Sequence, residues 1–356
     1  MARVVITGAG GFLGTAMTRA FIEAGHGVRA TDLERADLSV HSDLGAETMP
    51  ADVTVASDAA RALAEMEVVV HAAGIFDLTA PDALLWRVNA DAVRTVCEAA
   101  KGARRVIHIS STGVYGRCGL ETDEDSPKNA AMAYERSKRD GEQIAVQTCE
   151  ALGIPLAVLR PTLIYGEGSR YGLAPTMALF ALRKKRGLMT LPIAGGGPVG
   201  HLVHVRDVAA AAVLLATHDE APGRAYNVAD ERPVHAGDLV RALAETSKVP
   251  INNLALPWWT TRAYSPFKAV VAKVVAGQNI RMARSWERVV REEGLADALV
   301  PRVDMDFIDY MLGNHSYDTS RLRGLGFRCA HPDPFEGIAR TADWYRSQGW
   351  LPTFPG

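Results

Sequence analysis

The sequence predicts an α/β protein with a doubly wound parallel sheet and a smaller, mostly helical second part. Short apolar runs alternate with longer helical patterns through the first two thirds of the 356 residues. A glycine-rich turn joins the first apolar run to the first helical pattern, and the alternation stops near residue 231. A strand–helix–strand order of this kind is typical of parallel sheets that helices cover on both faces.

The elements follow in a regular order along the chain. The apolar runs that we predict as strands cover residues 3–9, 27–33, 68–74, 104–112, 155–166 and 223–229. The patterns that we predict as helices cover residues 15–25, 58–66, 89–102, 131–152, 204–218 and 233–247. We therefore expect one domain from residues 1–167 and 204–230, and a second part from residues 168–203 and 231–356.

Composition excludes several classes of protein. Lys and Arg total 39 and Asp and Glu total 41, which does not predict a broad nucleic-acid-binding surface. The four cysteines are scattered without a CxxC pair, which favours a reducing, cytoplasmic location over a disulfide framework or a zinc site. His201 and His204 are separated by two residues, but without a third ligand we predict no metal site. The N-terminal sequence has no signal-peptide pattern, and we expect no membrane-spanning run.

The glycine-rich turn predicts a diphosphate site. Gly8, Gly11 and Gly14 recur every three residues between the first strand and the first helix, with Phe12 and Leu13 in the same turn. Glycines at these positions allow a tight turn and a close approach of the diphosphate to the helix N-terminus. The spacing alone is weak evidence, and its place between a strand and a helix strengthens it.

An acidic residue at the end of the second strand predicts the choice of dinucleotide. Asp32 follows Gly8 by 24 residues, and its carboxylate can accept hydrogen bonds from both ribose hydroxyls while repelling a 2′-phosphate. This favours NAD over NADP. Arg35, three residues further on, could instead pair with a 2′-phosphate, and a helix-capping role is the other interpretation of Asp32.

Two further segments are candidates for contact with a dinucleotide. Asp52 and Val53 follow a further predicted strand and could border the adenine, or could belong to an ordinary loop. Ala72, Ala73 and Gly74 end the third apolar run with small side chains. Small residues there would let a ribose lie against the backbone, or would serve only close packing between strand and helix.

A group of hydroxyls and a lysine could carry acid–base chemistry. Ser110, Ser111 and Thr112 end the fourth strand, Tyr134 lies 23 residues beyond Ser111 at the start of a helix, and Lys138 follows one turn later on the same face. Hydride transfer to or from a carbinol carbon needs a group that exchanges a proton with oxygen. A free tyrosine titrates near ~10, so we expect a nearby ammonium to lower the phenol pKa. A serine hydroxyl can hold the substrate oxygen against the phenol.

These motifs in this order resemble the extended short-chain dehydrogenase/reductase family, which has a Rossmann-type domain and includes NAD-dependent epimerases, dehydratases and 3β-hydroxysteroid dehydrogenases. The likeness covers residues from Val4 to about Trp344. It implies NAD as cofactor, Tyr134 as acid/base, Lys138 on the nicotinamide ribose and Ser111 on the substrate oxygen. It also implies these further contacts: Pro161 with the cofactor, and Ile75, Thr112 and Thr162 with the substrate, Thr112 being second choice to Ser111. Asn89 resembles a family asparagine that either anchors the core or serves catalysis.

The stretches "LRPTLIYGEG" and "YDTSRLRGLGF" resemble the 3β-hydroxysteroid and sterol dehydrogenase branch more than the nucleotide-sugar branch. The resemblance implies oxidation of a 3β-hydroxyl on a sterol-like apolar substrate. A nucleotide-sugar epimerase or dehydratase with tightly bound NAD is the alternative. A non-catalytic dinucleotide sensor is a third hypothesis, which the intact serine, tyrosine and lysine set disfavours.

The aromatic and apolar stretch at 256–276 is open to three interpretations. It contains Trp258, Trp259, Tyr264 and Phe267 together with basic residues. It could make a peripheral membrane contact, form a lid over the active site, or belong to the core. We expect a homodimer that acts on a small apolar molecule.

Overall fold

The computed structural model describes residues 1–77, 80–187, 191–192, 196–252, 268–296, 298–305, 308 and 311–354. The chain divides into two compact units. Unit 1 comprises Met1–Thr162, Val205–Ala229 and Tyr317–Ala330, and unit 2 comprises Leu163–His204, Asp230–Ser316 and His331–Gly356.

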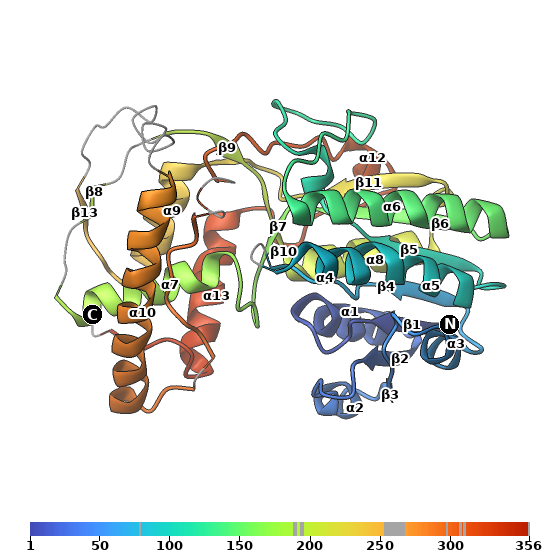
Figure 1. The fold of residues 1–356 in the computed structure, drawn as a ribbon, viewed down its shortest axis with the longest axis horizontal. Helices are drawn as coiled ribbons and strands as arrows, with labels where there is room; N and C mark the ends of the chain where they lie inside the picture. Colours follow the sequence, from blue (N-terminus) through green and yellow to red (C-terminus); the bar gives the residue numbers. More distant parts are fainter. Residues whose placement is uncertain are drawn as a thin grey trace. The chain divides into compact units, whose positions relative to one another are not determined.

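Unit 1 contains a seven-stranded parallel sheet, which confirms the predicted fold class (Figure 1). Its strand order is β11-β6-β5-β4-β1-β2-β3. The strands are β1 (Arg3–Thr7), β2 (Gly27–Asp32), β3 (Glu47–Pro50), β4 (Val68–His71), β5 (Arg105–Ile109), β6 (Leu156–Pro161) and β11 (Arg224–Val228). The chain order reverses between the neighbours β1 and β4. Doubly wound sheets bind their ligands beyond the carboxyl ends of the strands at such a reversal.

Helices cover both faces of this sheet. They are α1 (Phe12–Glu23), α2 (Ser39–Asp43), α3 (Ala56–Leu63), α4 (Asp82–Trp86), α5 (Ala92–Ala99), α6 (Ala133–Leu152), α8 (Val205–Thr217) and α12 (Ser320–Gly324). A π-helical turn spans Arg87–Asp91 and a 3₁₀ turn spans Thr112–Tyr115. The β1-to-β2 and β4-to-β5 connections advance in opposite directions, so right-handed crossovers place α1 and α5 on opposite faces. Helix α8 packs against α1, whereas α3 and α6 pack against α5.

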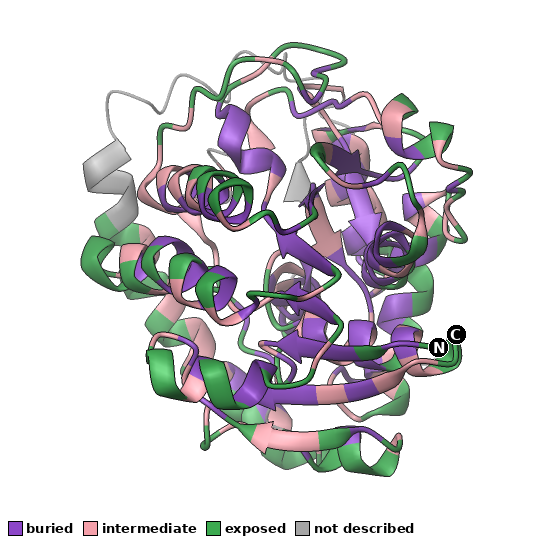
Figure 2. Cartoon of the chain, turned by 90° about the vertical axis from the view of Figure 1, so that its right-hand side faces the viewer, coloured by how far each residue is buried: buried purple, intermediate pink, exposed green. Residues whose placement is uncertain are grey.

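The apolar runs form the centre of the sheet. Val4, Val5 and Ile6 of β1 and Val69 and Val70 of β4 have no exposed surface. Figure 2 shows these inner strands as buried and the edge strand β3 as more exposed. Strands that helices cover on both faces are apolar at successive positions, which explains why continuous runs rather than alternation predicted them.

Unit 2 is mostly helical in its described part, as predicted. Its helices are α7 (Leu173–Lys185), α9 (Ala236–Glu245), α10 (Lys268–Glu293) and α13 (Pro334–Ser347). Its strands form three short pairs: β7 (Leu163–Tyr165) with β10 (Leu202–His204), β9 (Val199–Gly200) with β12 (Val234–His235), and β8 (Leu191–Pro192) with β13 (Ile251–Asn252). The single strand predicted over residues 155–166 is therefore two strands, which the unit boundary separates at Thr162.

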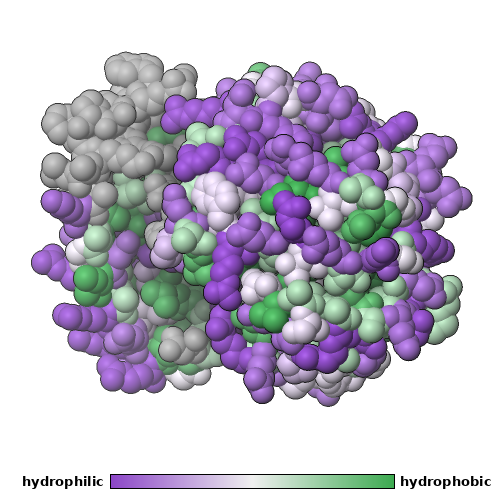
Figure 3. Space-filling view, turned by 45° about the vertical axis from the view of Figure 1, so that its right-hand side comes forward, coloured by the Kyte–Doolittle hydropathy of each residue, from purple (hydrophilic) through white to green (hydrophobic). Residues whose placement is uncertain are grey.

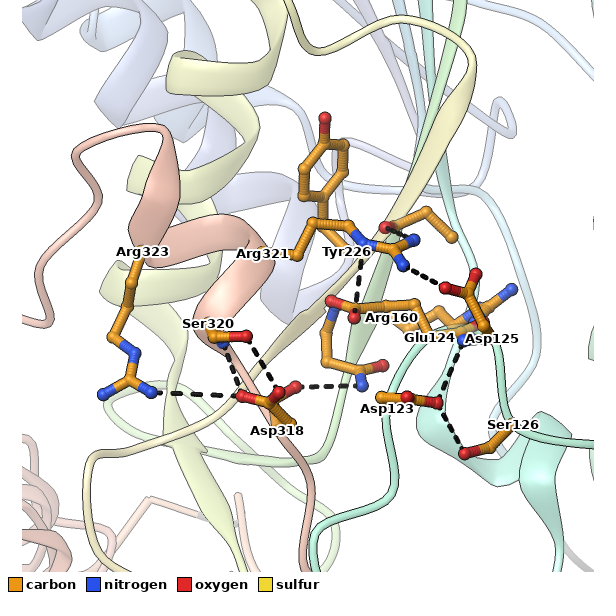
Figure 4. Close-up of polar contacts among 12 residues, drawn as sticks. Asp123, Glu124, Asp125, Ser126, Arg160, Tyr226, Asp318, Ser320, Arg321 and Arg323 are labelled. Atoms are coloured by element: carbon orange, nitrogen blue, oxygen red, sulfur yellow. Dashed lines mark hydrogen bonds and ion pairs between the residues drawn. The ribbon is translucent and has the colours of Figure 1, made fainter.

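Residues 317–330, which the sequence analysis placed in the second part, belong to unit 1. Arg321 of α12 lies 2.6 Å from the Asp125 carboxylate and 3.5 Å from the Glu124 carboxylate (Figure 4). The side-chain amide of Asn227 on β11 donates to the Asp318 carbonyl, and its backbone amide donates to Glu124. These bonds join α12, the edge strand and the loop before α6 into one cluster.

The aromatic stretch falls largely outside the described residues. Positions 253–267 lie outside them, so the three interpretations of 256–276 remain predictions. Residues 268–276 begin α10, where Val274 is 60% exposed. Among the described helices, none combines the length and apolar character needed to cross a membrane. The surface drawn in Figure 3 is mainly hydrophilic, with apolar residues interspersed.

Candidate functional site

The glycine turn brings the end of β1 against the segment that follows β4. Gly8 has a φ of +71°, and a Cβ atom there would lie 2.6 Å from the Ala73 Cα. A Cβ on Gly14 would lie 2.1 Å from the Gly8 carbonyl oxygen and 2.6 Å from the Ala9 Cα. All these neighbours are backbone atoms, which cannot rotate away as a side chain can. Both glycines are therefore required for the close approach of these segments.

The turn also leaves the start of α1 open. Helix α1 begins at Phe12, and its N-cap residue Gly11 has an extended backbone and no side chain to accept a hydrogen bond from the first amides. Unsatisfied amides and the helix dipole make such an end suitable for a negatively charged group. The residues of this turn therefore fit a dinucleotide diphosphate.

Asp32 lies beside the glycine turn at the end of β2. One carboxylate oxygen accepts the Gly10 amide at 3.0 Å, and the other accepts the Leu33 amide at 2.7 Å. Each oxygen retains a second acceptor position, which suits two ribose hydroxyls. The next described helix, α2, begins at Ser39, so the structure does not support the helix-capping interpretation.

Asp52 and Val53 follow the carboxyl end of β3, the strand that pairs with β2. The Asp52 carboxylate accepts the Thr54 amide at 2.9 Å, which forms a side-chain-stabilised turn. Its other oxygen lies 3.9 Å from the Arg87 guanidinium, and Val53 is buried. Strands β2 and β3 end at the same edge of the sheet. This arrangement is compatible with a contact between Asp52 or Val53 and the adenine, and also with an ordinary loop.

Asn89 fixes the segment that follows β4. Its side-chain oxygen accepts the Ile75 amide at 2.8 Å, and its side-chain nitrogen donates to the Ile75 carbonyl at 3.0 Å. The same nitrogen donates to the Ser137 hydroxyl of α6. Asn89 is buried within the π-helical turn, a local widening that is frequent near functional sites. Its described contacts give it an anchoring role, and its carboxamide lies 3.1 Å from the Cβ position of Gly74.

Ser111, Tyr134 and Lys138 come together at the carboxyl end of β5. Ser111 precedes the 3₁₀ turn, and its hydroxyl accepts the Gly113 amide at 3.0 Å. A hydrogen bond joins the Ser111 and Tyr134 side chains. The Lys138 ammonium donates to the Ile109 carbonyl at 2.7 Å and lies 3.7 Å from the Cβ position of Gly74. The predicted set therefore forms one cluster beside the segment after β4.

Burial dominates the electrostatics of this cluster. It raises the pKa of Tyr134 to about 12, against a smaller lowering by the hydrogen bond with Ser111. It lowers the pKa of Lys138 to about 8, against the attraction of Glu142. The sequence predicts the opposite, a phenol pKa that the nearby ammonium lowers. In this structure the cost of burying a phenolate is larger, so the pKa moves in the opposite direction.

The remaining predicted site residues differ in how exposed their side chains are. Ile75 is half-buried, and its backbone is the part that Asn89 holds. Thr112 is 1% exposed and Thr162 is 5% exposed, so protein atoms enclose both side chains. Their substrate contacts therefore stay predictions, and Ser111 is the more accessible of the hydroxyls. Pro161 ends β6 and is also buried.

A buried ionic cluster that the sequence analysis did not single out lies behind the site. Glu142 stands one helical turn beyond Lys138 and accepts hydrogen bonds from the Ser110 hydroxyl at 2.7 Å and from Arg160 at 2.6 and 2.9 Å. Lys128 approaches the same carboxylate at 2.5 Å. Burial opposes its charge, but the bonds from Arg160 and Lys128 outweigh it and lower the Glu142 pKa to about 2. The i, i+4 spacing from Lys138 is the signal that could have revealed it.

Comparison with known proteins places this geometry in a family. Residues 4–229 match the model of the NAD dependent epimerase/dehydratase family. A ketoreductase of 4-hydroxy-2-methyl-3-oxo-4-farnesyl-3,4-dihydroquinoline-1-oxide from Stigmatella aurantiaca is 28% identical over 98% of this chain and 99% of its own length. A 3-beta-hydroxysteroid dehydrogenase from Mycolicibacterium neoaurum is 25% identical over 68% of this chain and 69% of its own.

A solved structure has the same fold. The UDP-glucose 4-epimerase of Thermotoga maritima, solved with UDP-glucose, superposes with a TM-score of 0.71 at 19% identity, covering 97% of this chain and 99% of that one. The matched family segment contains the glycine turn, Asp32 and the serine, tyrosine and lysine cluster. The chain belongs to the NAD dependent epimerase/dehydratase family, and its cofactor is NAD.

Proposed function

We propose that the protein oxidises a secondary alcohol, the 3β-hydroxyl of a sterol- or steroid-like apolar substrate, with NAD as the oxidant. The observation that carries the proposal is the accessible Ser111 hydroxyl bonded to the Tyr134 phenol, one helical turn from the buried Lys138 ammonium. Two relatives, one matched over 98% of this chain and one over 68%, are named for ketone or 3β-hydroxyl chemistry on bulky apolar molecules, which supports this substrate class.

Each residue of the cluster has a defined task in this proposal. Bound NAD supplies an acceptor for the hydride of the carbinol carbon. Tyr134 takes the hydroxyl proton as the carbonyl forms, and Ser111 holds the same oxygen by a hydrogen bond. Lys138 places a positive charge beside the site and would bond the nicotinamide ribose. A phenol with a pKa of about 12 is protonated at neutral pH, so it is ready to donate in the reverse, ketone-reducing direction.

The decisive experiment compares two substrate classes. Purified protein is incubated with NAD and either a panel of 3β-hydroxysterols or UDP- and dTDP-hexoses, and NADH absorbance and sugar products are followed. We expect net NADH with sterols and none with sugars. Sugar turnover on a tightly retained cofactor, without net NADH, would instead identify a nucleotide-sugar epimerase or dehydratase.

Asp32→Ala is expected to relax the choice of dinucleotide. The variant loses the carboxylate that accepts ribose hydroxyls and repels a 2′-phosphate, so the ratio of NADPH to NADH dissociation constants should fall by about 10- to 100-fold. Fluorescence titration of the reduced dinucleotides measures this without a substrate. Asp43→Ala, an exposed acid on α2, is the control. An unchanged ratio in Asp32→Ala would refute the role assigned to this carboxylate.

A further inference from the structure

The Asn89 side chain links the segment after β4 to the start of α6. The Asn89 carboxamide pairs with both backbone groups of Ile75 and donates to the Ser137 hydroxyl at 3.1 Å. That hydroxyl in turn donates to the Tyr134 carbonyl at 2.7 Å. The backbone next to Phe76 is therefore held in a defined position relative to Tyr134.

The Phe76 ring packs against the Tyr134 ring. The Phe76 and Tyr134 rings lie 5.1 Å apart between centroids and are nearly perpendicular, at 83°. This edge-to-face arrangement is a favourable one for aromatic pairs. Phe76 is nevertheless 40% exposed, so much of its ring is open to solvent beside Tyr134, the residue proposed to take the substrate's hydroxyl proton.

A substrate that reaches Tyr134 has to pass close to this ring. Proton transfer requires the carbinol oxygen within about 3 Å of the phenol oxygen, and the carbons next to the carbinol then lie near the phenol ring and its neighbours. Because the backbone next to Phe76 is already fixed, contact with the ring costs little ordering of the protein. An apolar hydrocarbon gains from this contact, whereas sugar hydroxyls placed against the ring would lose hydrogen bonds to water.

We propose that Phe76 is a specificity-determining residue, which contacts the apolar body of the substrate beside the reacting carbinol and selects against polyhydroxylated substrates. This inference rests on the proposed function and extends it to a residue that determines substrate specificity. Asn89 acts as the positioning residue that keeps the ring in place.

The test compares Phe76→Ala and Phe76→Leu on two alcohols, a 3β-hydroxysterol and cyclohexanol. Phe76→Ala should lower kcat/KM for the sterol by roughly 10- to 100-fold and for cyclohexanol by less than about threefold, since only the larger substrate extends over the ring. Phe76→Leu retains an apolar surface and should recover most of the sterol activity. A second measurement, the dissociation constant of the 3-ketosterol from the enzyme–NADH complex, should rise by a similar factor in Phe76→Ala.

Two controls separate this role from a structural one. Val146→Ala truncates an exposed apolar residue of α6 that lies about 18 Å along the helix from Tyr134. It should leave kcat/KM unchanged for both alcohols. The NADH dissociation constant should be the same in all variants. Equal losses on both alcohols, or undiminished sterol turnover and ketosterol binding in Phe76→Ala, would overturn the role of Phe76. A wild-type protein that oxidises neither alcohol would overturn the proposed function itself.

Discussion

Tyr134→Phe is expected to lower kcat for alcohol oxidation by roughly 10²- to 10⁴-fold. The substitution removes the phenol oxygen, which is the only group of the cluster placed to take the carbinol proton in the proposed reaction, and keeps the aromatic ring that packs against Phe76. The NADH dissociation constant should change by less than about twofold, because the glycine turn and Asp32 are untouched. Steady-state kinetics and fluorescence titration measure the two effects separately.

The pH dependence gives a second signature of the same residue. Because the Tyr134 pKa is raised to about 12, its base form grows with pH, and kcat/KM for oxidation should rise toward pH 8. Above that, Lys138, whose pKa is about 8, loses its charge and opposes the rise. Tyr134→Phe should abolish the rise, while Tyr171→Phe, an exposed tyrosine of unit 2, should retain it. Wild-type activity in Tyr134→Phe would refute the assignment.

Spacing and order were enough to predict the doubly wound sheet and the cluster of Ser111, Tyr134 and Lys138. Continuous apolar runs reveal buried parallel strands, and residues four apart on a helix share a face, so both are local properties of the sequence. The direction of the Tyr134 pKa shift was not predictable, because it depends on burial by segments distant in the sequence. The enclosure of Thr112 and Thr162 is hidden for the same reason.

Contacts between distant segments explain the other differences. The Asn89 carboxamide lies in a π-helical turn and meets Ile75 fourteen positions away, and neither residue type signals that contact. The placement of 317–330 in unit 1 depends on Arg321 reaching acids nearly two hundred positions earlier. Phe76 was missed because a lone exposed aromatic in a sequence has no visible partner; the ring contact with Tyr134 gives it meaning.

Glu142→Gln is expected to destabilise the protein by about 3–5 kcal/mol, the usual cost of removing one member of a buried ion pair. The side chains of Glu142 and Arg160 are 1% and 3% exposed, so the substitution leaves the guanidinium charge buried without its carboxylate. Denaturant unfolding of the whole protein, followed by circular dichroism, measures the loss. Glu150→Gln, an exposed glutamate two turns further along α6, should change stability by less than about 0.5 kcal/mol.

The Glu142–Arg160 pair should also account for part of the loss of folding stability at low pH. The Glu142 pKa falls from 4.5 in the unfolded chain to about 2 in the folded one, so the folded state binds fewer protons. Stability from this group is therefore complete above about pH 4.5 and is lost as pH falls toward 2, an amount of about 3 kcal/mol. Glu142→Gln should lack this part of the pH dependence, whereas Glu150→Gln should keep it. If both variants unfolded with the wild-type acid profile, the buried carboxylate would not be the group that titrates. A double variant, Glu142→Leu with Arg160→Met, should recover most of the lost stability, because it removes both charges together.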